Sequence, residues 1–389
     1  MGVRDIWRII CDSFLRDLET WRHIVEWFMP SWFTVCMGSG ILATCIARLP
    51  YETPALRVFG LCIFFFNTAL LCAFLGLQLA QLLVYPRILA FMRQHPRRML
   101  HYGAIPMSLA TVVSGACAFW PSGQLGEFVL VVWALWWVSV VLAAAASLLL
   151  LCLIVSRQTH SIEGVTGAWL LLVAPLAVCA TAAGAIAEQL PPTAALLTTL
   201  IGYCLLGAGA PLTCCIVVLY VLRITTYKLP APDAIITAFI PLGPIGQIGA
   251  AALSLGAVAA RVELPALLAD LLLCAGILAA LLAWGSCVFW LAHAVLAVVY
   301  QRRSARIPFN MSWWALTFPV GVFAALTAGL ADALELGYLQ INFLVLVALL
   351  LVLWLFNIAR TVAGAWTGSI FGVSSPDITL AKPPADQNV

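Results

Sequence analysis

The side chains that could do chemistry are few in this sequence, and most are hydroxyls and amides set in apolar segments. The chain has thirteen cysteines. They form no C-x-x-C pair and no Cys/His cluster with zinc spacing, so we interpret them as small buried apolar residues. The sequence therefore predicts no metal site and no cofactor.

An intramembrane enzyme is the first functional class to weigh. The nearest approach to a nucleophile motif is Met37-Gly-Ser-Gly40, and Ser39 has no histidine in its own apolar segment. A rhomboid-like G-x-S-G motif, an H-E-x-x-H motif and a pair of aspartates at membrane depth are all absent from the sequence. We therefore expect a protein that is not an enzyme.

The composition identifies the setting of these residues. Of the 389 residues, 64% are apolar and 9% are charged, whereas a soluble domain has about half and about a quarter. Uncharged runs such as 128–156 are long enough to cross a bilayer as helices. A net charge of +3 argues against nucleic-acid binding, and continuous apolar runs exclude a β-barrel. The sequence predicts an all-α polytopic membrane protein embedded in the lipid bilayer.

Ten membrane spans are predicted, alternating between short and long. The short spans are rich in Gly, Ala and Pro, and the long ones in Leu, Val, Phe and Trp. In chain order the predicted spans are 31–49, 55–84, 103–121, 125–156, 168–189, 193–222, 238–260, 265–299, 312–331 and 339–364.

Helix-breaking residues recur in the short spans with a regular period. Successive separations of 68, 69, 69 and 75 residues join Gly38, Pro106, Pro175, Pro244 and Pro319. This period predicts five repeated helical hairpins, each with a short broken helix and a long intact one. Broken helices survive in a membrane only where they face protein or water, so we expect the five short helices inside, kinked around a central pore. Ordinary kinked packing is the alternative interpretation.

The predicted pore is neutral. Its polar candidates are Ser39, Ser108, Thr111 and Gln247, and the central turns of the short spans have no acidic or basic residue. His293 and Arg360 lie near the ends of long spans and are interpreted as interfacial anchors. Proton-driven pumps usually need titratable groups at membrane depth. A pore of hydroxyls and helix dipoles instead suits small anions that bind weakly.

Basic residues set the expected orientation. Sixteen of the nineteen Lys and Arg residues lie in the two termini and on the side that joins long spans to short ones, and the positive-inside rule places that side in the cytoplasm. We expect a cytoplasmic amphipathic segment over 1–30, a transport domain over 31–371 and a short cytoplasmic tail over 372–389. A plain cytosolic cap helix is the alternative for the first segment.

Several segments resemble the tellurite-resistance/dicarboxylate transporter family. They are Ser31-Trp-Phe-Thr-Val-Cys-Met-Gly-Ser-Gly40, Gly103-Ala-Ile-Pro-Met-Ser-Leu-Ala-Thr111, Pro241-Leu-Gly-Pro-Ile-Gly-Gln247, Trp313-Trp-Ala-Leu-Thr-Phe-Pro-Val-Gly321 and Arg360-Thr-Val-Ala-Gly-Ala-Trp-Thr-Gly-Ser-Ile-Phe371. The family includes bacterial TehA, plant slow anion channels, yeast malate permeases and fungal sulfite efflux pumps. Within it, the first and third segments are most similar to the sulfite exporters.

The resemblance implies further properties. It implies ten helices in five hairpins, a homotrimer with one pore per subunit, and a phenylalanine gate in the ninth span. Phe318 in the Thr-Phe-Pro motif is the best match for that gate, and Phe323 is the second. The expected function is export of sulfite or bisulfite through a gated pore in the plasma membrane. A malate or other C4-dicarboxylate permease and a less selective anion channel are the alternatives.

Overall fold

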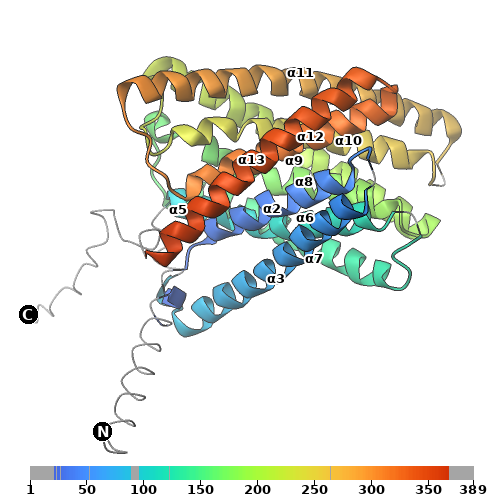
Figure 1. Ribbon diagram of the computed structural model, residues 1–389, viewed down its shortest axis with the longest axis horizontal. Helices are drawn as coiled ribbons and strands as arrows, with labels where there is room; N and C mark the ends of the chain where they lie inside the picture. Colours follow the sequence, from blue (N-terminus) through green and yellow to red (C-terminus); the bar gives the residue numbers. More distant parts are fainter. Residues whose placement is uncertain are drawn as a thin grey trace, which may run out of the picture.

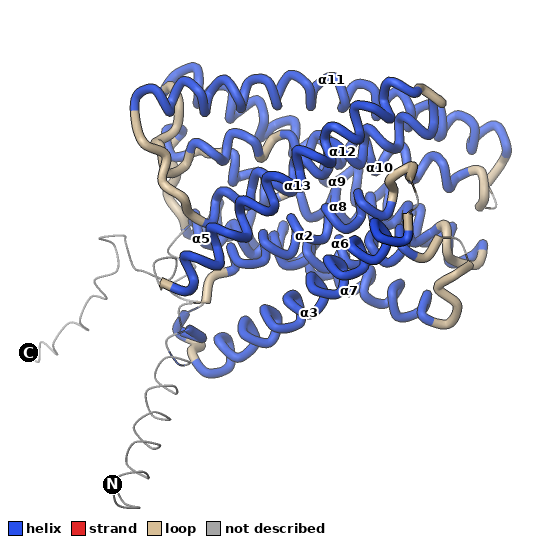
Figure 2. The backbone as a smooth tube through the Cα atoms, in the orientation of Figure 1, coloured by secondary structure: helices blue, strands red, loops and turns tan. Residues whose placement is uncertain are grey.

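The structure is a computed structural model that describes residues 22, 24–26, 28–51, 53–88, 96–121, 123–262 and 264–367. Every regular element in this part of the chain is a helix, and no strand occurs among these residues (Figure 2). The all-α prediction is confirmed. Most of the predicted segment 1–30 and the whole tail 372–389 lie outside the described residues, so these domain boundaries stay predictions.

Five long helices correspond to the even-numbered predicted spans. They are α3 (Pro54–Val84), α7 (Phe128–Arg157), α9 (Pro192–Tyr227), α11 (Ala266–Ser304) and α13 (Gly337–Trp366). In Figure 1 α11 and α3 lie at opposite edges of the molecule, with α2, α6 and α8 between them.

Each odd-numbered span is a 3₁₀ segment followed by an α-helix. The five pairs are η1 (Pro30–Trp32) with α2 (Phe33–Ala47), η2 (Leu100–Gly103) with α6 (Ala104–Phe119), η4 (Gly167–Leu172) with α8 (Ala174–Ala187), η5 (Ile235–Phe239) with α10 (Leu242–Ala259) and η6 (Met311–Trp313) with α12 (Trp314–Leu334). Two short elements, α5 (Pro96–Met99) and η3 (Ile162–Gly164), lie in the loops before η2 and η4.

Burial separates the two sets of helices. Nine described spans are long and apolar enough to cross a membrane, and α8 is a shorter apolar helix. In the candidate spans that contain α2, α6, α10 and α12, between 72% and 89% of the most apolar window is buried, against 22% to 28% for the five long helices. The short helices are therefore the inner set, and the long helices present apolar side chains outward.

The inner helices form a closed ring. Each packs against the long helix that follows it, as a hairpin requires, and α2, α6, α8, α10 and α12 also contact one another in that order. Contacts between α12 and α2 complete the circle. The predicted five hairpins are thus arranged with the small-residue helices inside.

Three of the four repeat prolines lie at the starts of the inner α-helices, whereas the sequence predicts kinks in the middles of these helices. Pro175 is the second residue of α8, and Pro106 and Pro244 are the third residues of α6 and α10. A helix tolerates proline in its first turn because those amides have no partner within the helix. Pro319 alone among the repeat prolines lies inside its α-helix, and the long helix α9 also contains an interior proline, Pro211.

Close approach of backbones explains the tight contact between α10 and α11. A Cβ atom placed on Gly276 would lie 2.5 Å from the Ala252 carbonyl oxygen, and one on Gly256 would lie 2.6 Å from the Leu272 carbonyl oxygen. Both distances are far below a van der Waals contact with rigid backbone. The two glycines therefore set how near α11 lies to the ring.

We expect Gly276→Ala to destabilise the protein by about 1–3 kcal/mol, because the added methyl forces α10 and α11 apart. The matched control is Gly285→Ala in the same helix, where an added Cβ would meet no described atom within 4 Å. Thermal unfolding of both purified variants checks this. Equal midpoints for the two variants would contradict it.

Candidate functional site

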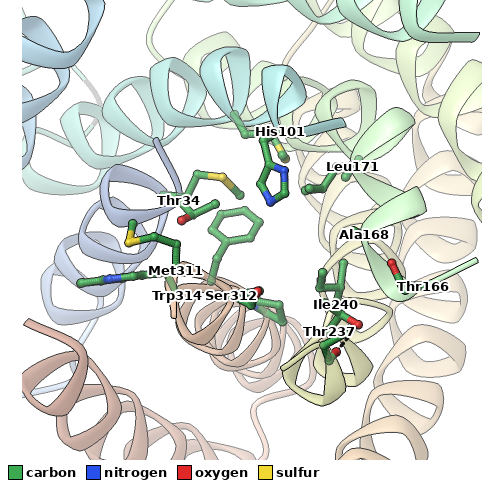
Figure 3. Close-up of a pocket in the computed structure, with 18 of the residues that line it drawn as sticks. Thr34, His101, Thr166, Ala168, Leu171, Thr237, Ile240, Met311, Ser312 and Trp314 are labelled. Atoms are coloured by element: carbon green, nitrogen blue, oxygen red, sulfur yellow. Dashed lines mark hydrogen bonds between the residues drawn. The ribbon is translucent and has the colours of Figure 1, made fainter. Parts of the chain in front are cut away.

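A cavity of about 220 Å³ lies where the first turns of the five inner helices meet. Every 3₁₀–α pair contributes to its wall. The lining residues are Thr34 and Met37 in α2; His101 and Met107 from η2 and α6; Thr166, Ala168, Leu171 and Ala174 around η4; Asp233, Ala234, Thr237, Ile240, Gly243 and Pro244 around η5; and Asn310, Met311, Ser312, Trp314, Ala315, Phe318 and Pro319 around η6. Figure 3 shows side chains from separate helices surrounding one space.

Each of the five inner helices contributes a residue near its start to the cavity wall: Met37, Met107, Ala174, Gly243 and Phe318. Four of them directly precede the repeated Gly38, Pro175, Pro244 and Pro319, whereas Met107 follows Pro106. Two of these residues are small, which leaves room in the ring for the single aromatic side chain among them. Phe318 is buried, with 5% of its surface exposed.

The same face of each inner helix continues away from the cavity. Residues four positions further on share this face, and all five are buried: Ile41, Thr111, Val178, Gln247 and Val322. Residues seven positions further on, two turns away, are Thr44, Ser114, Thr181, Ala250 and Ala325, and the last four are partly exposed again. The inner face is therefore closed for one turn between the cavity and a second, partly exposed layer.

Two of the predicted polar pore residues lie in the closed turn. The Thr111 hydroxyl donates to the Ser108 carbonyl oxygen at 2.7 Å, and the side-chain oxygen of Gln247 accepts a hydrogen bond from the Thr181 hydroxyl. The second contact links α8 to α10. Both side chains are on the face that lines the cavity but do not reach the cavity itself.

The other two predicted polar residues turn toward neighbouring helices. Ser39 accepts a hydrogen bond from the Trp354 indole at 2.9 Å, which ties α2 to the outer helix α13. The Ser108 hydroxyl lies 2.9 Å from the Phe33 carbonyl oxygen and 2.8 Å from that of Ala104, between α6 and the start of α2. Their hydroxyls are used in packing the ring.

The predicted helix-breaking residues divide in the same way. Pro244 and Pro319 line the cavity. Pro106 is buried in α6, and Pro175 packs near Gly103. A Cβ on Gly38 would lie within 3.2 Å of both Trp314 and Thr317, so this glycine permits the close contact of α2 with α12 that closes the ring.

The two candidate gate residues have different surroundings. Phe318 lines the cavity, one residue before Pro319. Phe323 is also buried, but its ring packs against Trp284 of α11 with the centroids 5.9 Å apart, away from the cavity wall. Geometry therefore favours Phe318 over Phe323 as the residue that can obstruct this space.

The electrostatics of the cavity come from helix ends and from two titratable side chains. The first turns of α2, α6, α8, α10 and α12, all within the described residues, contain no acidic residue, so five positive helix ends meet at the cavity without a carboxylate on them. Among the described lining residues, His101 and Asp233 are titratable. Sequence reasoning missed both because they lie outside the apolar spans. Their shared position shortly before the third and seventh spans was the available signal.

The anchors predicted from sequence lie elsewhere. His293 packs edge-on against Trp290 at 5.4 Å, and the Arg360 guanidinium lies 5.4 Å from the centre of the Phe309 ring. The described residues contain no group of three or more His, Cys, Asp or Glu side chains that could hold a metal ion. An apolar ring of five repeated hairpins around a closed, weakly polar cavity is the architecture of a membrane channel or transporter.

Comparison with known proteins identifies the family. The SLAC1 family model, described as voltage-dependent anion channel, matches residues 27–362. The sulfite efflux pump SSU1 of Trichophyton rubrum is 30% identical over 363 residues, covering 92% of this chain and 95% of that protein. The malic acid transport protein of Schizosaccharomyces pombe is 23% identical over 300 residues, covering 75% and 68%. The chain belongs to the SLAC1 family, and the resemblance to this transporter group is confirmed.

We expect Ser108→Ala to lower the free energy of unfolding by about 1 kcal/mol, because it removes a buried hydrogen bond between α6 and α2. Ser286→Ala is the control, since the Ser286 hydroxyl is exposed and donates to Leu282 within its own helix. Thermal or denaturant unfolding in detergent measures the difference. A Ser108→Ala variant as stable as the control would show that this contact contributes little.

Proposed function

We propose that this protein exports small anions, most specifically sulfite or bisulfite, through a gated pore along the axis of its inner ring. The observation that carries the proposal is the meeting of five helix N-termini at one cavity that Phe318 lines. Anions are attracted to the positive ends of helices. The family membership and the names of the relatives support the same class of substrate.

The physical basis of transport is a weak attraction followed by release. The cavity wall has no described lysine or arginine, so an anion attracted by the helix ends is not held by a permanently charged side chain. Rapid conduction needs this kind of shallow site. A membrane potential that is negative inside expels an anion with about 2.3 kcal/mol per charge per 100 mV.

The proposed gate is the Phe318 side chain together with the closed turn beyond it. The Phe318 ring shares the cavity with Ala174 and Gly243, the small residues that stand at the equivalent place in two other repeats. Pro319 cannot donate a backbone hydrogen bond to the Ala315 carbonyl, and this local break gives α12 a place to bend. Phe323 is the second candidate from sequence, and its packing against Trp284 supports a structural role for it rather than that of the gate.

The charge distribution and the outer surface support a proposal for where the protein lies and how it is oriented. We propose a plasma-membrane location with both termini in the cytoplasm, supported by the bias of Lys and Arg toward one side. The cavity would then open toward the cytoplasm. The outer helices expose apolar side chains such as Phe65, Val141 and Leu282 to lipid. We also propose a homotrimer, on the strength of the family resemblance.

The substrate is tested by currents across a reconstituted bilayer with sulfite, malate or chloride as the only anion. Sulfite current whose reversal potential stays at the sulfite Nernst potential when a pH gradient is imposed is the expected result. Reversal that follows the pH gradient would instead indicate proton coupling. Malate current without sulfite current would move the protein to the C4-dicarboxylate permeases, as the likeness to the malic acid transport protein allows.

We expect Phe318→Ala to raise anion current at least about fivefold, since removing the ring lowers the barrier by about 1 kcal/mol or more. Phe323→Ala is the matched control: it deletes the same kind of ring five residues and more than one turn away, where the ring packs on Trp284. We expect that variant to lose stability with no gain in current. Equal currents in the two variants would reject Phe318 as the gate.

A further inference from the structure

His101 occupies a distinctive place in the cavity. It is the second residue of η2 and is half-buried. Figure 3 shows its ring directed into the space bounded by Thr34 and Leu171. It is the only lining residue, among those described, that can carry a positive charge. The side chain is therefore placed where an anion entering the cavity would meet it.

Two of the four lining hydroxyls, those of Thr34 and Thr237, are poor candidates for binding an anion. The Thr34 hydroxyl donates to the Ser31 carbonyl oxygen at 2.6 Å, and the Thr237 hydroxyl donates to that of Ala234 at 2.7 Å. Each hydroxyl has a single proton, so these groups present lone pairs to the cavity. Lone pairs repel an anion.

The amide of Asn310 is engaged as well. Its nitrogen donates to the Asp233 carbonyl oxygen at 2.9 Å, and its oxygen accepts from the Ser312 amide at 2.9 Å. Protonated imidazole differs from these neutral groups in carrying a full positive charge. An N–H⁺ donor to an anion makes a stronger hydrogen bond than a neutral donor.

Asp233 gives the cavity an opposing charge. This exposed residue lines the cavity at the start of the η5 region. With His101 protonated the two titratable lining residues sum to zero charge, and with His101 neutral they sum to −1. Other ionisable residues on or beside the elements packed around η2 are Arg97, Arg98, Tyr102, Arg157, His160 and Glu163.

We propose that His101, in its protonated form, is the anion-binding residue of this cavity, and that it takes a small oxyanion. The proposal rests on the proposed function and deepens it by naming the group that binds. Histidine is the side chain whose charge ordinarily changes between about pH 5 and 8. Anion occupancy of the cavity therefore falls as the pH on its side of the membrane rises, and Asp233 opposes binding at every pH.

The test is anion-dependent thermal stabilisation of the purified full-length protein at pH 5.5 and 7.5. Nitrate is the probe because its charge is the same at both values, whereas sulfite itself titrates. A ligand at free concentration c that binds the folded state stabilises it by RT ln(1 + c/Kd), so the rise of the unfolding midpoint with nitrate concentration gives the dissociation constant, which is the half-saturating concentration. For the wild-type protein we expect the half-saturating nitrate concentration to rise about tenfold between the two pH values, the factor by which an ordinary histidine loses its proton.

Four variants make the test specific. His101→Gln binds nitrate weakly at both pH values, His101→Lys binds it well at both, and Asp233→Asn binds it more tightly than the wild type. His160→Gln is the matched control: His160 is exposed and packs edge-on against Trp169, outside the cavity wall, so this variant keeps the wild-type pH dependence. Unfolding midpoints without nitrate confirm that each variant is folded, and His101→Lys supplies the readout if His101→Gln does not fold.

Two results would overturn the proposal. One is a His101→Gln variant with wild-type nitrate affinity and pH dependence, and the other is a wild-type protein that nitrate does not stabilise at pH 5.5. Failure of the proposed function is a separate outcome. Nitrate binding that depends on His101, without anion current in the wild type or in Phe318→Ala, would leave the binding site standing and reject the pore.

Discussion

The meeting of five parallel helix N-termini at one cavity is the constraint on which the rest of the structure depends. Like ends of helix dipoles repel, so such a ring needs an offsetting arrangement. Each inner helix packs against the outer helix that follows it in the chain, and because the two form a hairpin their dipoles oppose. The hairpin repeat thus permits a convergence of positive helix ends that parallel helices alone would resist.

Close packing of this ring depends on small residues and on hydroxyls used inside it. Gly38 lets α2 approach α12 where the circle closes. The Ser39 and Ser108 hydroxyls form hydrogen bonds to neighbouring helices. Polar groups buried in an apolar bundle must be paired, so most polar residues of the inner helices hold the ring together rather than face a permeating ion.

The five repeats differ from one another in the side chains that they place at the cavity. One such residue near the start of each inner helix lines the cavity, and Phe318 is the aromatic one among Met37, Met107, Ala174, Gly243 and Phe318. A single side chain facing smaller neighbours can obstruct the axis or leave it without repacking the whole ring. The charged groups are equally asymmetric, with His101 in the second repeat and Asp233 in the fourth.

The sequence by itself determined the class, the ten spans and the five hairpins. The length of each apolar run shows whether it can cross a bilayer, and the regular recurrence of Gly38, Pro106, Pro175, Pro244 and Pro319 reveals the hairpin repeat. Tertiary structure alone decided which side chains face the axis. Helix rotation is set by packing against neighbours, so Thr111 and Gln247 lie in the closed turn, Ser39 and Ser108 turn away, and Phe318 rather than Phe323 reaches the cavity. His101 lines the cavity because the fold places the segment that precedes the third span at the wall of the cavity. The spacing of residues along the chain does not predict this placement.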